Sequence, residues 1–302
     1  MDNKLPNWLI DRLPEYEKVY SVPQAFCDST HLLWRLQGPS LDDLDQKNHF
    51  LKLCSNTESP FWQIMQRLFD FNLRTEITNF AHTYAFINKR CSFAIPELIK
   101  AETLENNNAY ILTSELEGSA IESADLANSD EMIKQLANHL AMLHSNPINS
   151  WGSINKPVFT SLDWSYRLKT TLVESANKWG GVLLNSDKYL IKALDACDLI
   201  EITEFVPMMP DLRWDQFLHN GNDITALIDL DAFVFAPREL DFVILEYILT
   251  SDQIRLFSNS YSKHHAIPDI AQMRPAYRLL LFYMQILGET DLDGWMKKEA
   301  LF

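Results

Sequence analysis

The chain has 302 residues, of which 47% are hydrophobic and 12% aromatic, and its formal net charge is −15. This hydrophobic content is enough for a packed core, which excludes a disordered chain, and the length suits one large domain or two lobes. The acidity argues against binding to nucleic-acid backbones or anionic membrane surfaces, because both attract clustered Lys and Arg. A cationic or neutral small molecule is a better-matched partner, although acidity also serves to keep a protein in solution.

The sequence contains neither a targeting segment nor a cysteine motif. Residues 1–16 carry charges throughout and lack the apolar stretch of a signal peptide. No apolar run approaches the roughly 18 to 20 residues of a membrane span. Since Cys27, Cys54, Cys91 and Cys197 have no CxxC spacing, metal and disulfide roles are not expected. We therefore expect a cytoplasmic protein, and the oligomeric state stays open.

The first third of the chain alternates short strand-like runs with helical patterns. Apolar and β-branched runs predict strands at 31–37, 49–54 and 109–116. Helical spacing of apolar residues predicts helices at 59–71 and 74–90. The first of these helices looks like an insertion.

After Gly118 the helical pattern dominates. Apolar residues recur at helical spacing in 130–144, 161–179, 239–262 and 273–287. A strand-rich part followed by a helix-rich part predicts an α+β fold with two lobes, 1–116 and 117–302.

The stretch MPDLRWDQFLHNGNDITALIDLDAF, residues 209–233, carries the clearest chemical signal. Asp211 follows a proline in a polar loop, and Gln216 lies five positions later. Asp229 lies eighteen residues after Asp211, within an apolar run, and alternation along a strand places Asp231 on the same face as Asp229. Carboxylate oxygens that point together suit Mg²⁺. Apolar neighbours argue against the alternative, an exposed hairpin.

These residues resemble the active-site motifs of the aminoglycoside phosphotransferase-like family, which includes choline, homoserine and fructosamine kinases. The family loop H-G-D-L-H-x-x-N corresponds to residues 209–216, its I-D strand end to 228–229 and its acidic D-L/D-F pair to 239–242. The helix ending in L-A-M-L-H and the strands at 49–54 and 109–118 also match in order. The resemblance covers about residues 30 to 285. It implies a bilobal protein-kinase-like fold, with a small antiparallel sheet in the N-terminal lobe and a larger helical C-terminal lobe.

In the C-terminal lobe the resemblance assigns the phosphoryl-transfer chemistry. Asp211 would receive the proton of an acceptor hydroxyl, and Arg213 would lie beside the transferring phosphate. Gln216 and Asp229 would bind Mg²⁺, with Asp231 as a supporting group and Asp215 as a further oxygen donor. Such a division of roles matches a transition state whose charge is spread over oxygens.

In the N-terminal lobe the resemblance implies a site for ATP or GTP. Lys52 would hold the phosphates, because an ammonium in an apolar strand is costly unless it meets an anion. Glu76 would pair with Lys52, and the backbone of Ser114, Glu115 and Leu116 would contact the base. The alternatives are an edge-strand lysine that faces solvent and a solvated carboxylate at a helix N-terminus.

Three positions depart from the family pattern. Met209 replaces the loop histidine, and Gln216 replaces the metal-binding asparagine. Between His31 and His49, where we expect the turn over the phosphates, Gly38 is the only glycine. These departures keep two rivals open: a pseudokinase that serves as a nucleotide- or protein-binding module, and an enzyme of this fold that transfers another group.

The acceptor is expected to be a small hydroxylated molecule, cationic or neutral, of the amino-sugar, fructosamine or amino-alcohol class. A fructosamine-kinase-like acceptor surface is indicated by Trp164, Tyr166, Arg167, Arg274, Tyr277 and Arg278. These tracts are equally compatible with core helices that carry arginines at the rim. Glu239 and Asp241 are expected to brace the catalytic loop, and His144 to be a buried, satisfied histidine.

Overall fold

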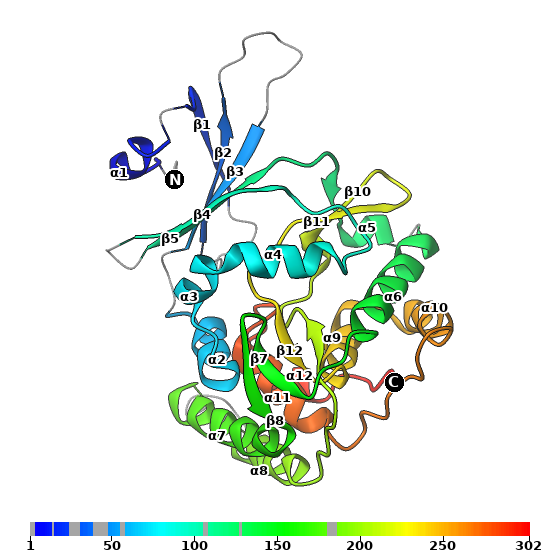
Figure 1. Ribbon diagram of the computed structural model, residues 1–302. Coiled ribbons are helices and arrows are strands. Elements are labelled where there is room, and N and C mark those ends of the chain that lie inside the picture. The colour runs from blue at the N-terminus through cyan, green and yellow to red at the C-terminus, as the bar shows by residue number, and fades with distance from the viewer. Residues whose placement is uncertain are drawn as a thin grey trace.

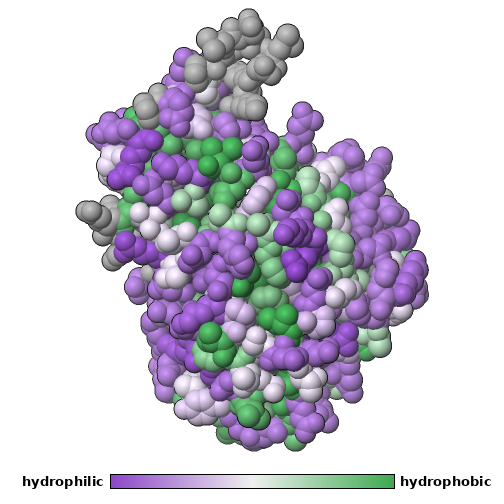
Figure 2. All heavy atoms as spheres, viewed as in Figure 1, coloured by the Kyte–Doolittle hydropathy of each residue, from purple (hydrophilic) through white to green (hydrophobic). Residues whose placement is uncertain are grey.

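A computed structural model describes residues 4–13, 15–23, 31–38, 48–54, 58–104, 108–126, 129–179 and 186–302 of the chain. It has the predicted α+β architecture, with a strand-rich N-terminal lobe above a larger helical lobe (Figure 1). Polar residues cover most of the face shown in Figure 2, while the hydrophobic residues fill two internal clusters. No helix in the described ranges is both long and apolar enough to cross a bilayer.

The N-terminal lobe is built on a five-stranded antiparallel sheet with the order β1-β2-β3-β5-β4. Its strands are β1 (Lys18–Val22), β2 (His31–Gln37), β3 (Asn48–Cys54), β4 (Leu98–Thr103) and β5 (Ala109–Ser114). The predicted strands at 31–37 and 49–54 are confirmed, while β1 and β4 were not predicted. Both carry lysines and several half-exposed residues, which weaken the apolar pattern.

The two faces of this sheet bury different residues. Leu51 and Leu53 of β3 are buried in a cluster with Leu9 of α1 (Asn7–Ile10). Because side chains alternate along a strand, Lys52 and Cys54 point to the opposite face, toward the rest of the molecule. The strand pattern therefore aims the Lys52 ammonium at the junction of the lobes.

Two short helices cover the sheet where one helix was expected. The predicted helix at 74–90 is divided into α3 (Leu73–Thr78) and α4 (Phe80–Asn88) at Asn79, which has φ −103° and ψ 15°. The Asn79 side chain donates to the Thr75 carbonyl and so satisfies an acceptor at the end of α3. Both helices pack against β4.

The predicted helix at 59–71 is α2 (Pro60–Phe69), and it leaves the N-terminal sheet altogether. It packs against helices α7 (Ser161–Trp179) and α11 (Arg274–Met284) of the C-terminal lobe, as Figure 1 shows. Its apolar face, with Ile64, Leu68 and Phe69 fully buried, explains this position. A segment from the first third of the sequence thus belongs to the C-terminal core.

The C-terminal lobe combines long helices with short strands. Its helices are α5 (Ser123–Leu126), α6 (Asp130–His144), α7 (Ser161–Trp179), α8 (Ser186–Cys197), α9 (Glu239–Ile248), α10 (Ser251–Tyr261), α11 (Arg274–Met284) and α12 (Leu292–Met296). Its strands are β6 (Ser119–Ala120), β7 (Ser150–Ser153), β8 (Lys156–Thr160), β9 (Val206–Met208), β10 (Phe217–His219), β11 (Ile224–Leu227) and β12 (Val234–Ala236). The predicted helices 130–144 and 161–179 agree with α6 and α7.

The expected helix at 239–262 is two helices, α9 and α10. The break falls at Leu249, which has extended dihedrals, and Thr250 caps α10 by accepting a hydrogen bond from the Gln253 backbone. The Gln253 side chain accepts from the Thr250 N–H in return, which completes a capping box. Because the apolar periodicity continues across this break, the sequence pattern predicted a single helix.

Backbone hydrogen bonds join the two lobes near the cleft. The Ala94 N–H donates to the Thr225 carbonyl (3.1 Å), and the Leu227 N–H donates to the Ala94 carbonyl (2.9 Å). The segment after α4 is thereby fixed to β11, whose end leads directly to Asp229. This attachment positions the C-terminal motif opposite Lys52.

Candidate active site

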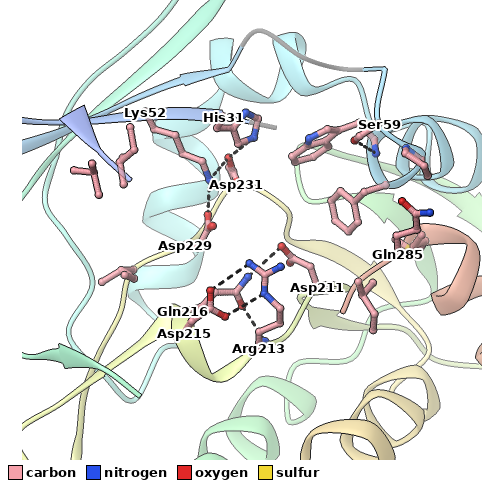
Figure 3. Close-up of a pocket in the computed structure, with 18 of the residues that line it drawn as sticks. His31, Lys52, Ser59, Asp211, Arg213, Asp215, Gln216, Asp229, Asp231 and Gln285 are labelled. Atoms are coloured by element: carbon pink, nitrogen blue, oxygen red, sulfur yellow. Dashed lines mark hydrogen bonds and ion pairs between the residues drawn. The ribbon is translucent and has the colours of Figure 1, made fainter. Parts of the chain in front are cut away.

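Lys52 and two aspartates meet where the lobes face each other. The Lys52 Nζ lies 2.8 Å from Asp229 Oδ1 and 2.8 Å from Asp231 Oδ2 (Figure 3). As the alternation predicted, both carboxylates reach the same side. The two aspartates follow β11 directly, and Lys52 is in β3, so the contact joins the lobes. The edge-strand alternative for Lys52 is wrong.

The three charges shift one another's pKa values. Burial disfavours the charge on Lys52, but the two carboxylates outweigh burial and hold its pKa above the usual value. Burial also opposes ionisation of Asp229, yet Lys52 lowers its pKa below the usual range. Burial and the charge on Asp229 raise the pKa of Asp231 to about 8. Asp229 is therefore the firmly ionised member of the pair.

The loop before β10 brings Asp211 and Gln216 together. The Gln216 Nε2 donates to Asp211 Oδ2 (3.1 Å), and Gln216 Oε1 accepts from the Arg213 N–H (3.1 Å). Gln216 ends a 3₁₀ turn, η2 (Trp214–Gln216), so its side chain folds back over the start of that turn. The Arg213 guanidinium pairs with Asp215 (Nε to Oδ1, 3.1 Å).

Asp211 is poised as an acceptor of a proton. Its Oδ1 is buried and has no hydrogen-bond partner in the described part of the chain. Burial and the Asp229 charge raise the pKa of Asp211 to about 6, against the opposing effects of Arg213 and Lys52. A carboxylate with a raised pKa and a free oxygen can take a proton from a bound hydroxyl near neutral pH.

A cavity of about 380 Å³ connects these groups. It is lined from the N-terminal sheet, the loop at 211–216, the segment after β11, the start of α2 and the end of α11 by Val22, Pro23, His31, Leu33, Lys52, Ser59, Pro60, Phe61, Trp62, Asp211, Arg213, Asp215, Gln216, Ile228, Asp229, Asp231, Met284, Gln285 and Ile286. Figure 3 shows Lys52, His31, Asp229 and Asp231 on one side of it, with Asp211, Arg213 and Gln216 across from them. The volume is within the roughly 300 to 1,000 Å³ of small-molecule sites.

The oxygen donors in this cavity fit a magnesium ion. Asp229 and Asp231 supply carboxylate oxygens, and Gln216 supplies an amide oxygen, which are the hard ligands that Mg²⁺ prefers. The Gln216 oxygen accepts one hydrogen bond and retains a second lone pair. The donor set is thus compatible with the metal that the sequence resemblance implied.

Glu76 does not join this site. Its carboxylate accepts a hydrogen bond from Asn155 Nδ2 (2.5 Å), a residue of the turn between β7 and β8. It lines a second cavity with His82 and Asn155, and it is absent from the lining of the first. The solvated alternative is also wrong, since Glu76 is 6% exposed. The pairing of Glu76 with Lys52 is therefore not present, and Asp229 and Asp231 take that place.

The expected hinge residues Ser114, Glu115 and Leu116 lie outside the lining of the main cavity. The Ser114 N–H donates to the Glu97 carbonyl, and the Glu115 N–H donates to the Asn48 carbonyl. The Leu116 N–H has no such partner within the described ranges. Contact of these residues with a nucleotide base stays a prediction, and Leu116 retains a free donor for it.

The expected turn over the phosphates, between His31 and His49, falls largely on residues 39–47, which lie outside the described part of the chain. Val22, Pro23 and His31 line the cavity, so the ends of β1 and β2 border it. Gly38 follows the opposite end of β2 and does not line it. The segment 24–30, which links β1 to β2 in the sequence, lies outside the described residues, as does Cys27.

The proposed acceptor tracts on α7 and α11 are structural. Arg274 and Arg278 both pair with the fully buried Glu246 of α9. The Trp164 Nε1 donates to the Tyr277 hydroxyl, and both side chains are buried. None of these residues lines the main cavity, which favours the core-helix interpretation for them, whereas Tyr166 of α7 is 73% exposed.

His144 is a satisfied core histidine, as expected. Its Nδ1 lies 2.7 Å from the Tyr261 hydroxyl, and its Nε2 lies 3.0 Å from Asp241 Oδ2. Asp241 thus holds the end of α6 rather than the catalytic loop. Glu239 opens α9.

Sequence reasoning missed several cavity residues. Ser59 at the N-cap of α2 and Gln285 at the C-cap of α11 border the site from segments without a catalytic motif. Gln285 has φ 57°, a left-handed conformation that is usually adopted by glycine or asparagine and was therefore not predicted for a glutamine. Ser59-Pro60 is a typical start of a helix, but no local pattern indicated where α2 would pack.

Solved structures share this architecture. The GDP complex of wild-type aminoglycoside 2'-phosphotransferase-IIIa superposes with a TM-score of 0.60 and 14% identity, covering 92% of this chain and 87% of that one. ADP-bound aminoglycoside phosphotransferase APH(2'')-Ib gives 0.58 and 12%, covering 97% and 96%. The macrolide 2'-phosphotransferase MphH of Brachybacterium faecium, as apoenzyme, gives 0.60 and 11%, covering 98% and 99%.

No family model and no curated protein matches the chain in sequence. At 11–14% identity the likeness to these structures is one of fold. It extends over nearly the full length of both partners in each comparison, so it includes the two lobes together. The chain therefore has the bilobal kinase-like fold of the aminoglycoside and macrolide phosphotransferases.

Proposed function

We propose that the protein is a nucleotide-dependent phosphotransferase that acts on a hydroxyl group of a small molecule, with ATP or GTP as donor and Mg²⁺ as cofactor. The observation that carries the proposal is the convergence of Lys52, Asp211 and Asp229 on one cavity between the lobes. Support comes from the fold, since structures that share it were solved with ADP or GDP bound.

The proposed roles follow from the contacts. Lys52 exchanges one of its carboxylate partners for a nucleotide phosphate, while Asp229 and Gln216 hold the metal. Bound Mg²⁺ supplies positive charge to the phosphate oxygens as the phosphoryl group moves. Asp211 Oδ1 orients the acceptor hydroxyl and takes up its proton, since the other oxygen is held by Gln216. Arg213 lines the same cavity, which supports its proposed role as a cation near the phosphoryl group.

The acceptor side of the cavity favours a small hydroxylated molecule of neutral or positive charge. Asp211 and Asp215 line it, and apolar surface is added by Phe61 of α2 and by Ile286, which follows α11. Structures with this fold include complexes with kanamycin and with hygromycin B. The chain's charge of −15 also disfavours an anionic acceptor. A cytoplasmic site of action belongs to the same proposal.

A binding module without catalysis is the second candidate, and specific contacts favour it. Lys52 is neutralised by two carboxylates, Glu76 is held away from it by Asn155, and the Gln216 oxygen already accepts from Arg213. Each of these contacts has to change before Lys52 and Gln216 can hold the nucleotide phosphates and the metal ion as phosphoryl transfer requires. A protein that binds nucleotide weakly and transfers no phosphate would fit them.

The decisive experiment measures binding and turnover on the same preparation. Calorimetric titration with Mg-ATP and Mg-GTP tests the nucleotide site. A nucleotide-consumption screen over amino-sugars, fructosamines, amino-alcohols and hydroxy-amino acids tests transfer. Binding with turnover supports the kinase. Binding without turnover for any acceptor supports the module, and absence of binding refutes both.

A further inference from the structure

Three potential metal ligands of different type meet behind Lys52. His31 begins β2, Cys54 ends β3, and the two are directly paired across the strands. Asp231 approaches them from the C-terminal lobe. The ligand atoms of these three residues all lie within 4.8 Å of one another, and His31 Nε2 is 3.5 Å from Asp231 Oδ2.

We propose that His31, Cys54 and Asp231 form a binding site for a thiophilic divalent cation, Zn²⁺ in particular, which shares only Asp231 with the magnesium donor set. Typical Zn–S, Zn–N and Zn–O bonds of about 2.3, 2.0–2.1 and 2.0–2.2 Å place tetrahedral ligand atoms roughly 3.4 to 3.6 Å apart. The His31–Asp231 separation already meets this spacing. Movements of about 1 Å bring the remaining atoms into range.

The donor types select the metal. A thiolate and an imidazole favour Zn²⁺ over Mg²⁺, which prefers oxygen. Cys54 is 2% exposed and carries no disulfide, so its thiol is protected and available. His31 and Asp231 also line the main cavity, which leaves the fourth position to water or to a ligand in the cleft. The absence of CxxC spacing had argued against a metal-binding role for the cysteines. The sequence alone did not show that His31 and Cys54 are paired across neighbouring strands.

The site would couple zinc to the lobes. Two ligands come from the N-terminal sheet and one from the C-terminal lobe, so the ion bridges the cleft. Asp231 Oδ2 is the same atom that Lys52 contacts at 2.8 Å. A cation bound there displaces the Lys52 ammonium and repels it, and the bridge restricts opening of the lobes. Zinc is therefore expected to oppose Mg-nucleotide binding.

Cobalt substitution tests the site without reference to activity. Titration of the metal-free full-length protein with Co²⁺ should give thiolate-to-cobalt absorption and the visible bands of a tetrahedral site, saturating at one ion per chain and reversed by Zn²⁺. Cys54→Ala should abolish the thiolate absorption. Cys91→Ala and Cys197→Ala, which remove described cysteines outside the site, should retain it.

The results separate cleanly. A wild type without thiolate absorption, or a Cys54→Ala variant that keeps it, overturns the proposal. If Cys54→Ala fails to fold, His31→Gln decides: zinc affinity should fall by about tenfold or more, and unchanged affinity overturns the site. A further arm rests on the proposed function. Stoichiometric Zn²⁺ should weaken Mg-nucleotide binding in wild type but not in Cys54→Ala. If the protein binds no nucleotide at all, that result refutes the kinase proposal and leaves the zinc site to be decided by the cobalt titration.

Discussion

The ammonium of Lys52 lies 2.8 Å from the carboxylate of Asp231, at the same distance that separates it from Asp229. One cation thus offsets the half-buried carboxylate of Asp229 and the buried carboxylate of Asp231 across the cleft. A nucleotide phosphate that reaches Lys52 has to displace one of them. The exchange is feasible only if the released aspartate gains another cation, and a magnesium ion that enters with the nucleotide is such a partner.

Replacing Lys52 with Ala should have two opposite effects. The stabilisation by Mg-nucleotide, seen as a rise in melting temperature, should largely disappear because the phosphates lose their cation. Mg²⁺ alone should stabilise the variant more than wild type, because Asp229 and Asp231 face each other without an ammonium. Differential scanning fluorimetry with and without nucleotide measures both. Lys100→Ala, on the outer strand β4, is the matched control and should behave as wild type.

Asp211→Asn should separate binding from transfer. The asparagine keeps the contact with Gln216 but cannot accept a proton, so Mg-nucleotide affinity should stay within a few-fold of wild type. Phosphorylation of an identified acceptor should fall on the order of a hundredfold or more, the scale of a positioned acid–base group. Asp215→Asn, on the same loop and paired with Arg213, should cost less. Equal losses in both variants would argue against a proton-accepting role for Asp211.

Sequence patterns predicted the features that depend on interactions between neighbouring residues. The helix 130–144 agrees with α6 because Ser129 caps it and apolar residues recur through it. The resemblance carried by Asp211, Gln216 and Asp229 predicted their convergence, and the hairpin of β10 and β11 sets the separation of Gln216 and Asp229. These features depend on residues close in the sequence.

Partner choice between distant segments could not be predicted in the same way. Glu76 had the right residue type on the right helix, yet Asn155, far along the chain, holds it elsewhere. The position of α2 depends on a hydrophobic surface assembled from α7 and α11, which no local pattern describes. The break at Leu249 was hidden because buried residues continue on both sides. In each case tertiary packing outweighs local preference.

Glu76→Gln should stabilise the protein at neutral pH. Burial raises the pKa of Glu76, against the opposing hydrogen bond from Asn155. Between its unfolded and folded pKa values the folded state holds more protons, so the free energy of unfolding falls as pH rises. Glutamine avoids that loss and still accepts from Asn155. Urea unfolding should show wild type and variant equal below the unfolded pKa, near 4.3, and the variant more stable at pH 7.

The same variant tests the kinase arrangement. Because Glu76 is bonded to Asn155 rather than to Lys52, Glu76→Gln should leave Mg-nucleotide affinity close to that of wild type. A loss as large as that of Lys52→Ala would mean that Glu76 moves to Lys52 when nucleotide binds. Calorimetric titration of both variants side by side distinguishes the two outcomes.

His139 should limit stability in acid. Burial lowers its pKa to about 3, and its Nδ1 accepts from the Ser92 hydroxyl (2.9 Å), a contact that protonation at Nδ1 would disrupt. Below pH 6.5 the unfolded chain binds a proton that the folded chain excludes, so stability falls with pH, by up to about 1.4 kcal/mol per unit for one proton. His139→Asn keeps an acceptor for Ser92 but cannot titrate. In urea unfolding, the variant should therefore lose less stability than wild type between pH 6 and pH 4. The control variant His264→Asn, which changes an exposed histidine, should lose as much stability as wild type. If the stability of His139→Asn fell in parallel with that of wild type, this account would be contradicted.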